Sequence, residues 1–424
     1  MMDDMSNVYL TVYILFWLIV FIIYQKRRRY FGTASVIILS YLIYAICSYI
    51  MYNDEYLGIG RERLHLFPFV YLGAMLLVAI APAMKFKEET ISIRPPNLLI
   101  LDVFSYIFIF CSIIRIPDII DNIQQGIVLL LMDPSGGESL YYATHDKIIA
   151  NVGGGISNIF AIIYNLFIDV AILFYFYYLT LSKRKRVIIV GYTILIICSL
   201  LDPLSQGLRT GVLMKTFNII IAFFLMKPLL GSKVKQIVKV VGTVVFSFVI
   251  ILFISLTISR FGDRNIGTQG SMLSYIGQAN INFNTSILDA GGTREANRTC
   301  NLFKQMLGYS DIPRNVVETR VRYSNLKIDD SVFSTFVGDF VLDFGPVVAP
   351  IIFILFSLFI RNKTKATKSG VIQFHQVILI YFSMIICMQG GMYLFDYSYG
   401  NNLVILAFVF IYFVFKFDRI YSIK

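Results

Sequence analysis

The sequence predicts an all-α, polytopic integral membrane protein, and three observations support this prediction. Hydrophobic residues make up 57% of the 424 residues, charged residues only 15%, and the mean hydropathy is +0.72. Soluble cores stop growing at about 250–300 residues, so most of this apolar surface needs lipid as its solvent. The apolar runs are mostly about 17 to 25 residues long, which suits helices and is too long for the strands of a membrane barrel.

About 11 such runs alternate with polar loops, and each predicts one transmembrane helix. The expected helices are 8–25, 33–52, 66–84, 97–116, 156–181, 187–204, 211–230, 237–258, 333–360, 371–389 and 402–418. The first has no basic segment before it and ends in Lys26–Arg29 without a small-residue cleavage site, so we expect a retained span and not a signal peptide. We expect residues 1–424 to form a single polytopic membrane domain, with one large outer loop, 259–332, between helices eight and nine.

Basic residues predict the orientation, because lysine and arginine gather in cytoplasmic loops. They cluster in alternate short loops, at Lys26–Arg29, Lys85 and Lys87, Lys183–Arg186, Lys233 and Lys235, and between Arg361 and Lys368, and again in the tail. An outside N-terminus and a cytoplasmic C-terminus fit every cluster. The localisation that follows is multi-pass, in the cytoplasmic membrane.

The composition argues against several classes of function. The formal net charge of +11 belongs largely to these loops, where it also meets anionic headgroups, so we expect membrane lipids as partners and no nucleic acid. Four of the five cysteines fall inside expected spans and only Cys300 lies outside, so no disulfide framework is expected. The three histidines are scattered, with no CxxC or HExxH pattern, which predicts neither a metal site nor a cofactor.

The outer loop 259–332 contains seven arginines and only two lysines. The guanidinium is a fixed fork of donors that suits phosphate and pyrophosphate, whereas a lysine is a point charge. This bias indicates an anionic, lipid-anchored ligand, although a solvated loop that carries charge is the alternative. The predicted substrate-binding residues are Arg260, Arg264, Arg320 and Arg322.

A tight outer hairpin, Ser205–Gly211, joins the sixth and seventh spans. Gly207 and Gly211 permit a sharp turn, and Arg209 stands at the bilayer boundary where the next helix starts. Helix N-termini favour anions, so Arg209 is a candidate catalytic residue. The alternative is a plain hairpin with a snorkelling arginine.

The third polar feature is the segment 333–346, at the outer end of the ninth span. Asp339 and Asp343 are four residues apart and therefore share one helical face. Carboxylates at membrane depth are costly, and these two are candidate catalytic residues, either as a base or as partners that orient arginines. A structural ion pair with an outer-loop arginine is the alternative for each. Gly345-Pro346 predicts a kink or a re-entrant turn. His145 in the second outer loop is a further candidate base in the substrate site, and a plain surface histidine is the alternative.

Charged residues inside other spans are functional candidates by position alone. These are Asp102 and Arg115 in the fourth span and Asp169 in the fifth. Their partners cannot be read from the sequence.

Together these features resemble a known family. The hairpin Gln-Gly-Leu-Arg-Thr-Gly, the arginine-bearing outer loop and the Ser-Thr…Gly-Asp…Asp-Phe-Gly-Pro entry to the next helix resemble Wzy-type O-antigen polymerases, which polymerise oligosaccharide repeat units and are similar in architecture to O-antigen ligases. The resemblance runs through most of the chain as topology, and its local motifs cover 207–211 and 260–346. It assigns anion-binding roles to Arg209, Arg260 and Arg264.

The resemblance implies a metal-independent glycosyltransferase at the outer face of the bacterial inner membrane. The donor would be a growing glycan on undecaprenyl pyrophosphate, and the acceptor a lipid-linked repeat unit whose hydroxyl attacks the anomeric carbon. Because the leaving group is a lipid pyrophosphate, the main demand is for preorganised positive charge. A chain-length regulator and a flippase are the candidate protein partners.

Two other functions remain open. A lipid-linked oligosaccharide flippase or polysaccharide transporter also needs anion-binding arginines, but the chain lacks the repeated halves and paired broken helices that such transporters usually have. An O-antigen ligase is the nearest enzymatic alternative.

Overall fold

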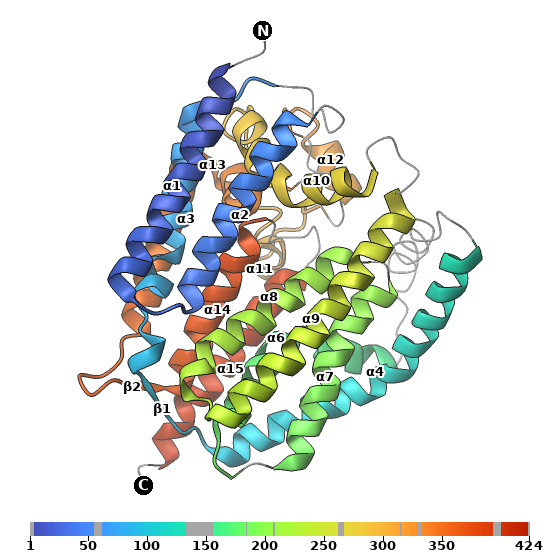
Figure 1. The fold of residues 1–424 in the computed structure, drawn as a ribbon, viewed down its shortest axis with the longest axis vertical. Coiled ribbons are helices and arrows are strands. Elements are labelled where there is room, and N and C mark those ends of the chain that lie inside the picture. Colours follow the sequence, from blue (N-terminus) through green and yellow to red (C-terminus); the bar gives the residue numbers. More distant parts are fainter. Residues whose placement is uncertain are drawn as a thin grey trace. The chain divides into compact units, whose positions relative to one another are not determined.

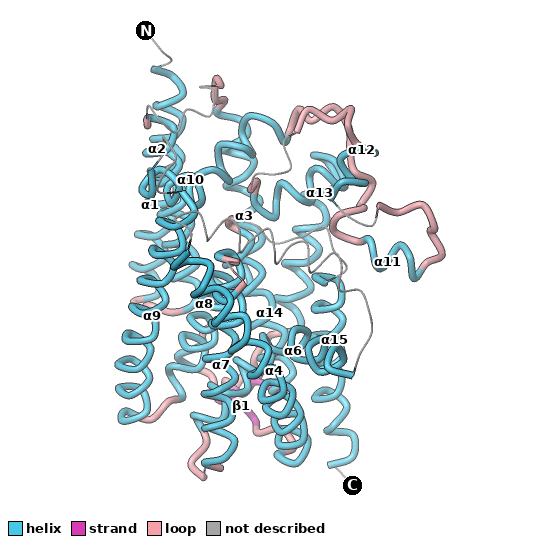
Figure 2. Tube along the Cα trace, turned by 90° about the vertical axis from the view of Figure 1, so that its right-hand side faces the viewer, coloured by secondary structure: helices cyan, strands magenta, loops and turns pink. Residues whose placement is uncertain are grey.

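The computed structural model of the chain describes residues 4–54, 62–132, 156–183, 185–206, 208–261, 267–313, 316–328, 333–392 and 400–422. Within these residues the protein is almost wholly helical, as Figure 2 shows. The helices are α1 (Asp4–Arg28), α2 (Thr33–Asn53), α3 (Leu66–Lys85), η1 (Glu88–Thr90), α4 (Leu98–Met132), α6 (Ile156–Thr180), α7 (Arg186–Ser205), α8 (Arg209–Met226), η2 (Lys227–Leu229), α9 (Ser232–Phe261), α10 (Gly267–Asn282), η3 (Phe283–Ile287), α11 (Asn301–Met306), α12 (Val316–Arg322), α13 (Thr335–Lys363), α14 (Phe374–Gly390) and α15 (Gly400–Ser422). The strands are β1 (Ser92–Arg94) and β2 (Val371–Gln373).

The predicted fold class is confirmed. Every expected span falls on a helix, and nine helices of the described part are long and apolar enough to cross a membrane. The two other expected spans correspond to α14, a shorter apolar helix, and to α9, whose first turns carry lysines. Large apolar side chains such as Leu99 and Val187 are 70% and 72% exposed, which a soluble surface would not tolerate over so many helices and which lipid covers.

The chain forms two compact units. Unit 1 comprises Met1–Ile91, Met272–Ile372 and Phe382–Phe410. In it α1 packs against α2 and α3, and α13 packs along α3 (Figure 1). Buried aromatic rings join these helices, because Trp17 of α1 meets Tyr41 of α2 edge-on with their centroids 4.9 Å apart.

Unit 2 comprises Ser92–Ser271, Gln373–Tyr381 and Ile411–Lys424. Its core is a bundle in which α4 packs against α6 and α7, and α8 packs against the same two helices. Helix α9 covers α7 and α8 and exposes Ile237, Val240 and Val244, as a lipid-facing helix does.

The segment expected as an outer loop, 259–332, is largely folded where the structure describes it. It carries α10, η3, α11 and α12, and within unit 1 asparagines join its later part to α2 and to the residue before α3. Asn280 donates to Ser48 Oγ at 3.0 Å, and Asn284 donates to the carbonyl of His65 at 2.7 Å. A Cβ atom at Gly277 would lie 2.6 Å from the carbonyl oxygen of Cys47, so only glycine allows α10 to approach α2 this closely.

The kink predicted at Gly345-Pro346 is confirmed. Gly345 lies inside α13 with φ of 82° and ψ of 163°, outside the helical region. The segment that precedes it, from Thr335, carries the two aspartates of the candidate site.

Candidate functional site

Asp339 and Asp343 lie on one face of the first turns of α13, as their spacing predicts, and each is 2% exposed. The helix begins at Thr335, whose N–H donates to the carbonyl of Met392 at 3.0 Å. Thr335 has φ of 69°, a rare conformation for a β-branched residue. Strained backbone therefore lies one turn before the buried carboxylates, a location where strain is often functional.

Two arginines of the preceding segment pair with these carboxylates. Arg294 Nε lies 3.0 Å from Asp343 Oδ1, and Arg298 Nε lies 3.3 Å from Asp339 Oδ1. Arg294 also reaches across to Asp339, with Nη2 3.8 Å from Oδ1 and 3.3 Å from the backbone carbonyl oxygen. We call these four residues the ionic quartet. All four are buried, and their formal charges cancel.

Asp343 also holds the backbone that carries the arginines. Its Oδ2 accepts the N–H of Arg298 at 3.1 Å and the N–H of Thr299 at 2.7 Å. Both of its carboxylate oxygens are therefore occupied, and its geometry is that of an anchor. Asp339 contacts both arginines, with its Oδ1 3.3 Å from Arg298 Nε and 3.8 Å from Arg294 Nη2.

One donor of the quartet is left unused. Arg294 Nη1 is buried and has no hydrogen-bond partner among the residues that the structure describes. Buried charged donors without a partner are rare, because each loses its hydration without compensation. The quartet therefore places an unused guanidinium donor in the same buried cluster as the Asp339 carboxylate.

A chain of polar contacts extends from the quartet to the surface. Lys304 Nζ donates to Asn297 Oδ1 at 2.6 Å, and Asn297 Nδ2 donates to the hydroxyl of Tyr323. Burial raises the pKa of the Tyr323 phenol, so the hydroxyl stays protonated at neutral pH. The guanidinium of Arg322 lies 5.8 Å from the centroid of the Tyr323 ring.

The predicted substrate-binding residues Arg320 and Arg322 lie on the exposed helix α12. Arg322 pairs with Asp311 at 2.8 Å, and the side chain of Asp311 is 88% exposed. Arg320 is exposed as well. The structure thus brings Arg294 and Arg298 to the aspartates, whereas Arg322 pairs with Asp311 and Arg320 is exposed.

Three predicted residues cannot be placed in a site. His145 and Arg264 lie outside the described residues. Arg260 belongs to α9, and its side chain is not described.

Arg209 is the first residue of α8, two residues before the expected start of this span at 211, and it is 7% exposed. It belongs to unit 2, in the hairpin between α7 and α8. The turn is closed by the Leu208 N–H, which donates to the carbonyl of Pro203 at 2.8 Å. Gly211 is needed here because a Cβ atom would lie 2.7 Å from Pro203 Cβ.

Beside this hairpin, α7 contributes a buried carboxylate, Asp202. It accepts hydrogen bonds from Gln206 at 2.8 Å and from Arg115 of α4 at 3.3 Å. Arg115 also pairs with Asp118 at 2.7 Å. Arg115 was a candidate by position, and Asp202 is the partner that the sequence did not identify.

A second ion pair lies between α6 and α8 of unit 2. Lys215 Nζ lies 2.6 Å from Asp169 Oδ1, which also accepts a hydrogen bond from Asn218 at 2.8 Å. Tyr164 of α6 interacts electrostatically with Asp169, Asp202 and Arg115, yet its buried hydroxyl has no hydrogen-bond partner within the described ranges. Tyr164 thus interacts with members of both ion pairs of this bundle.

The remaining intramembrane candidate, Asp102, makes contacts that are typical of a structural role. It accepts a hydrogen bond from the Tyr178 hydroxyl at 2.5 Å and pairs with Lys185 of the loop before α7. The hydrogen bond that the exposed Lys185 ammonium donates to Asp102 raises the pKa of this ammonium.

Some of the residues that the sequence analysis did not identify could have been found from the sequence, and others could not. Asp202 and Lys215 are charged residues at or inside apolar runs, and such residues normally have a partner there. Nothing in the sequence distinguishes Arg294 and Arg298 from the other arginines of 259–332, because their partners lie more than 40 residues away.

Comparison with known proteins finds no protein family, no characterised protein and no solved structure that matches this chain.

Proposed function

We propose that this chain is a membrane glycosyltransferase that polymerises undecaprenyl-pyrophosphate-linked repeat units into O-antigen or capsular polysaccharide, at the outer face of the bacterial inner membrane. The observation that carries the proposal is the ionic quartet, where the Asp339 carboxylate accompanies a buried guanidinium donor, Arg294 Nη1, that has no partner in the described part of the chain. A carboxylate and an unused cationic donor are the two groups that metal-free transfer from a pyrophosphate needs.

In the proposed reaction the acceptor hydroxyl oxygen attacks the anomeric carbon of the donor glycan. A new glycosidic C–O bond forms, and the bond from that carbon to the pyrophosphate oxygen breaks. Its electron pair goes to undecaprenyl pyrophosphate, and the hydroxyl proton goes to Asp339. Arg294 donates to the oxygen on which negative charge develops, and Asp343 keeps Arg294 in place through its Nε contact at 3.0 Å.

The orientation belongs to the proposal. With the N-terminus outside and the C-terminus in the cytoplasm, 259–332 and the start of α13 lie on the outer face, where lipid-linked repeat units are polymerised. Arg209, buried at the start of α8 in unit 2, is by itself a further candidate for binding a phosphate group. A flippase that delivers units and a regulator of chain length are the partners that this activity requires.

The test combines a deletion strain with purified protein. In the deletion strain, lipid-linked single units should accumulate on the outer face, with surface glycan one repeat long. Proteoliposomes that contain the protein and the lipid-linked units should produce a ladder of longer glycans without added metal or nucleotide. Units stranded on the inner face, with no ladder in proteoliposomes, would refute the proposal.

The second candidate is a transporter of lipid-linked oligosaccharide, and the ion pairs of unit 2 favour it. Lys215–Asp169 and Arg115–Asp202 lie between apolar helices, and intramembrane charges often mark the path of a substrate. An assay of headgroup movement across proteoliposomes separates the two functions, because a polymerase leaves each unit on the side where it was added. An O-antigen ligase would instead transfer finished glycan and would leave the single units unpolymerised.

A further inference from the structure

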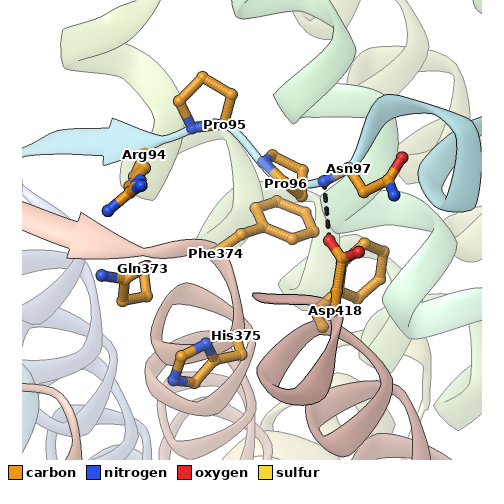
Figure 3. Close-up of a pocket in the computed structure, with 9 residues that line it drawn as sticks. Arg94, Pro95, Pro96, Asn97, Gln373, Phe374, His375 and Asp418 are labelled. Atoms are coloured by element: carbon orange, nitrogen blue, oxygen red, sulfur yellow. Dashed lines mark hydrogen bonds between the residues drawn. The ribbon is translucent and has the colours of Figure 1, made fainter. Parts of the chain in front are cut away.

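A small cavity of about 200 Å³ lies in unit 2, where β1 runs into α4 and where α14 begins (Figure 3). Its polar lining comes from Arg94, Asn97, Gln373, His375 and Asp418, and its apolar side includes Phe374 and Phe415. At about 30 Å³ for each water molecule, the volume equals about seven waters. Pockets for drug-sized ligands occupy about 300–1,000 Å³, so this cavity suits a small polar headgroup and not a glycan.

The cavity contains a cation and an anion that do not neutralise each other. Arg94 makes no ion pair or hydrogen bond with any side chain that the structure describes, although Asp418 lines the same space. Asp418 accepts the backbone N–H of Asn97 through Oδ2 at 2.9 Å, the dashed contact in Figure 3, and its Oδ1 has no such contact in the described part. A ligand that carries both charges would satisfy both side chains.

The cavity lies at the depth of lipid headgroups. The apolar span of α4 begins at Leu98, directly after Asn97, and the span of α15 ends at Asp418. Next to these residues, Leu99 is 70% exposed and Phe417 is 49% exposed, as lipid-facing side chains are. A headgroup in the cavity would therefore have its acyl chains beside the same two helices.

We propose that this cavity binds the aminoethyl phosphate headgroup of a zwitterionic phospholipid. The guanidinium of Arg94 receives the phosphate through its planar fork. The first turn of α4, capped by Asn97 Oδ1 at 3.0 Å from the N–H of Leu99, adds the partial positive charge of a helix start. The primary ammonium donates to Asp418 Oδ1. This inference does not depend on the proposed glycosyl transfer.

Native mass spectrometry of the full-length protein tests the inference. The protein is incubated with equal amounts of phosphatidylethanolamine, phosphatidylglycerol and phosphatidylcholine, and the lipids retained on each protein ion are counted. Phosphatidylglycerol keeps the phosphate but lacks the amine, and the choline ammonium cannot donate a hydrogen bond. We expect phosphatidylethanolamine to be retained at least about tenfold more than the other two, which is about 1.4 kcal/mol.

Two pocket variants and one control distinguish the roles of the charges. Asp418→Asn keeps an acceptor for the Asn97 N–H and should abolish the preference for phosphatidylethanolamine over phosphatidylglycerol. Arg94→Gln should lower the retention of all three lipids. Arg186→Gln removes an equally exposed cation at the start of α7 and should leave the preference unchanged. Thermal unfolding of each variant reports whether the fold is retained.

Equal retention of the three lipids by the wild-type protein, an unchanged preference in Asp418→Asn, or unchanged retention in Arg94→Gln would overturn the proposal. Water-soluble glycerophosphoethanolamine serves as a competitor. If it displaces the lipid at equal concentration, the ligand is a soluble phosphate ester and the assignment to a membrane lipid is wrong. If it does not, the acyl chains contribute as the exposed Leu99 and Phe417 lead us to expect.

Discussion

Arg294 and Asp343 are 49 residues apart in the sequence and meet in the interior of unit 1, where Nε of the arginine lies 3.0 Å from Oδ1 of the aspartate. Their side chains are 1% and 0% exposed. The pair fastens the segment before α11 to the first turns of α13. Because Asp339 lies one helical turn before Asp343, the same contact fixes where the Asp339 carboxylate stands relative to the guanidinium.

Removal of one member of this pair should strongly destabilise the protein. Arg294→Met leaves the Asp343 carboxylate buried without its cation, and an uncompensated buried charge costs about 3–5 kcal/mol. Arg322→Met is the matched control, because its exposed pair with Asp311 should contribute about 0–1 kcal/mol. The measurement is the thermal unfolding midpoint of each purified variant in detergent.

A double-mutant cycle extends that test to the pair itself. Arg294→Met combined with Asp343→Leu should be less destabilised than the sum of the two single changes, by about 0.5–3 kcal/mol, because no lone charge remains buried. Strict additivity would mean that the two side chains do not interact in the folded protein.

The two aspartates of α13 should respond differently to replacement by asparagine. Asp343 uses both oxygens as acceptors, and asparagine has only one, so Asp343→Asn should lower protein abundance and glycan polymerisation together. Asp339→Asn keeps an oxygen acceptor for Arg298 but leaves the quartet with an uncompensated positive charge, so its abundance should fall as well. Per inserted protein, it should lose about a hundredfold or more in polymerisation if Asp339 is the base. Immunoblots of membranes and glycan ladders give the two readouts.

If well-expressed Asp339→Asn protein polymerises normally, the proposed role of Asp339 is wrong. His145 would then be the next candidate base. If Asp343→Asn is abundant and inactive, the roles assigned to the two carboxylates are exchanged.

The orientation can be tested with single cysteines at two exposed serines of unit 1. Ser324→Cys should react with an impermeant maleimide from the outer face, and Ser369→Cys should react only after the membrane is opened. Burial raises the pKa of the Cys300 thiol, so less thiolate is present at neutral pH. Cys300 alone should therefore label more slowly than Ser324→Cys, and faster as the pH rises. Protection of Ser324→Cys with labelling of Ser369→Cys would reverse the orientation.

Much of the fold could be predicted from the sequence, because helices that cross lipid need long apolar runs, and these runs are easy to recognise. The helix that starts at Arg209, the shared face of Asp339 and Asp343, and the kink at Gly345 all follow from local rules. The sequence is sufficient to predict a feature that depends only on neighbouring residues or on their spacing within one helix.

The partners of the candidate residues could not be read, because they depend on contacts over long sequence distances. Arg294 and Arg298 differ from Arg320 and Arg322 only in their position in the folded chain, where the first two are buried and the latter two are exposed. The folding of 259–332 was missed for a related reason. Its helices are short and are held by polar contacts such as that of Asn284 with His65, which leave no apolar periodicity.

The last prediction concerns two buried tyrosines of unit 2 with opposite environments. The Tyr178 hydroxyl donates to Asp102 at 2.5 Å, so Tyr178→Phe should destabilise the protein by about 1.5–3 kcal/mol, as expected for a hydrogen bond to a charged group. The Tyr164 hydroxyl is buried without a partner in the described part of the chain, so Tyr164→Phe should leave the unfolding midpoint unchanged or raise it. A midpoint that falls in Tyr164→Phe by as much as in Tyr178→Phe would mean that the Tyr164 hydroxyl does have a bonding partner. If the midpoint is unchanged while polymerisation or transport is lost, the hydroxyl contacts substrate between the two ion pairs of this bundle.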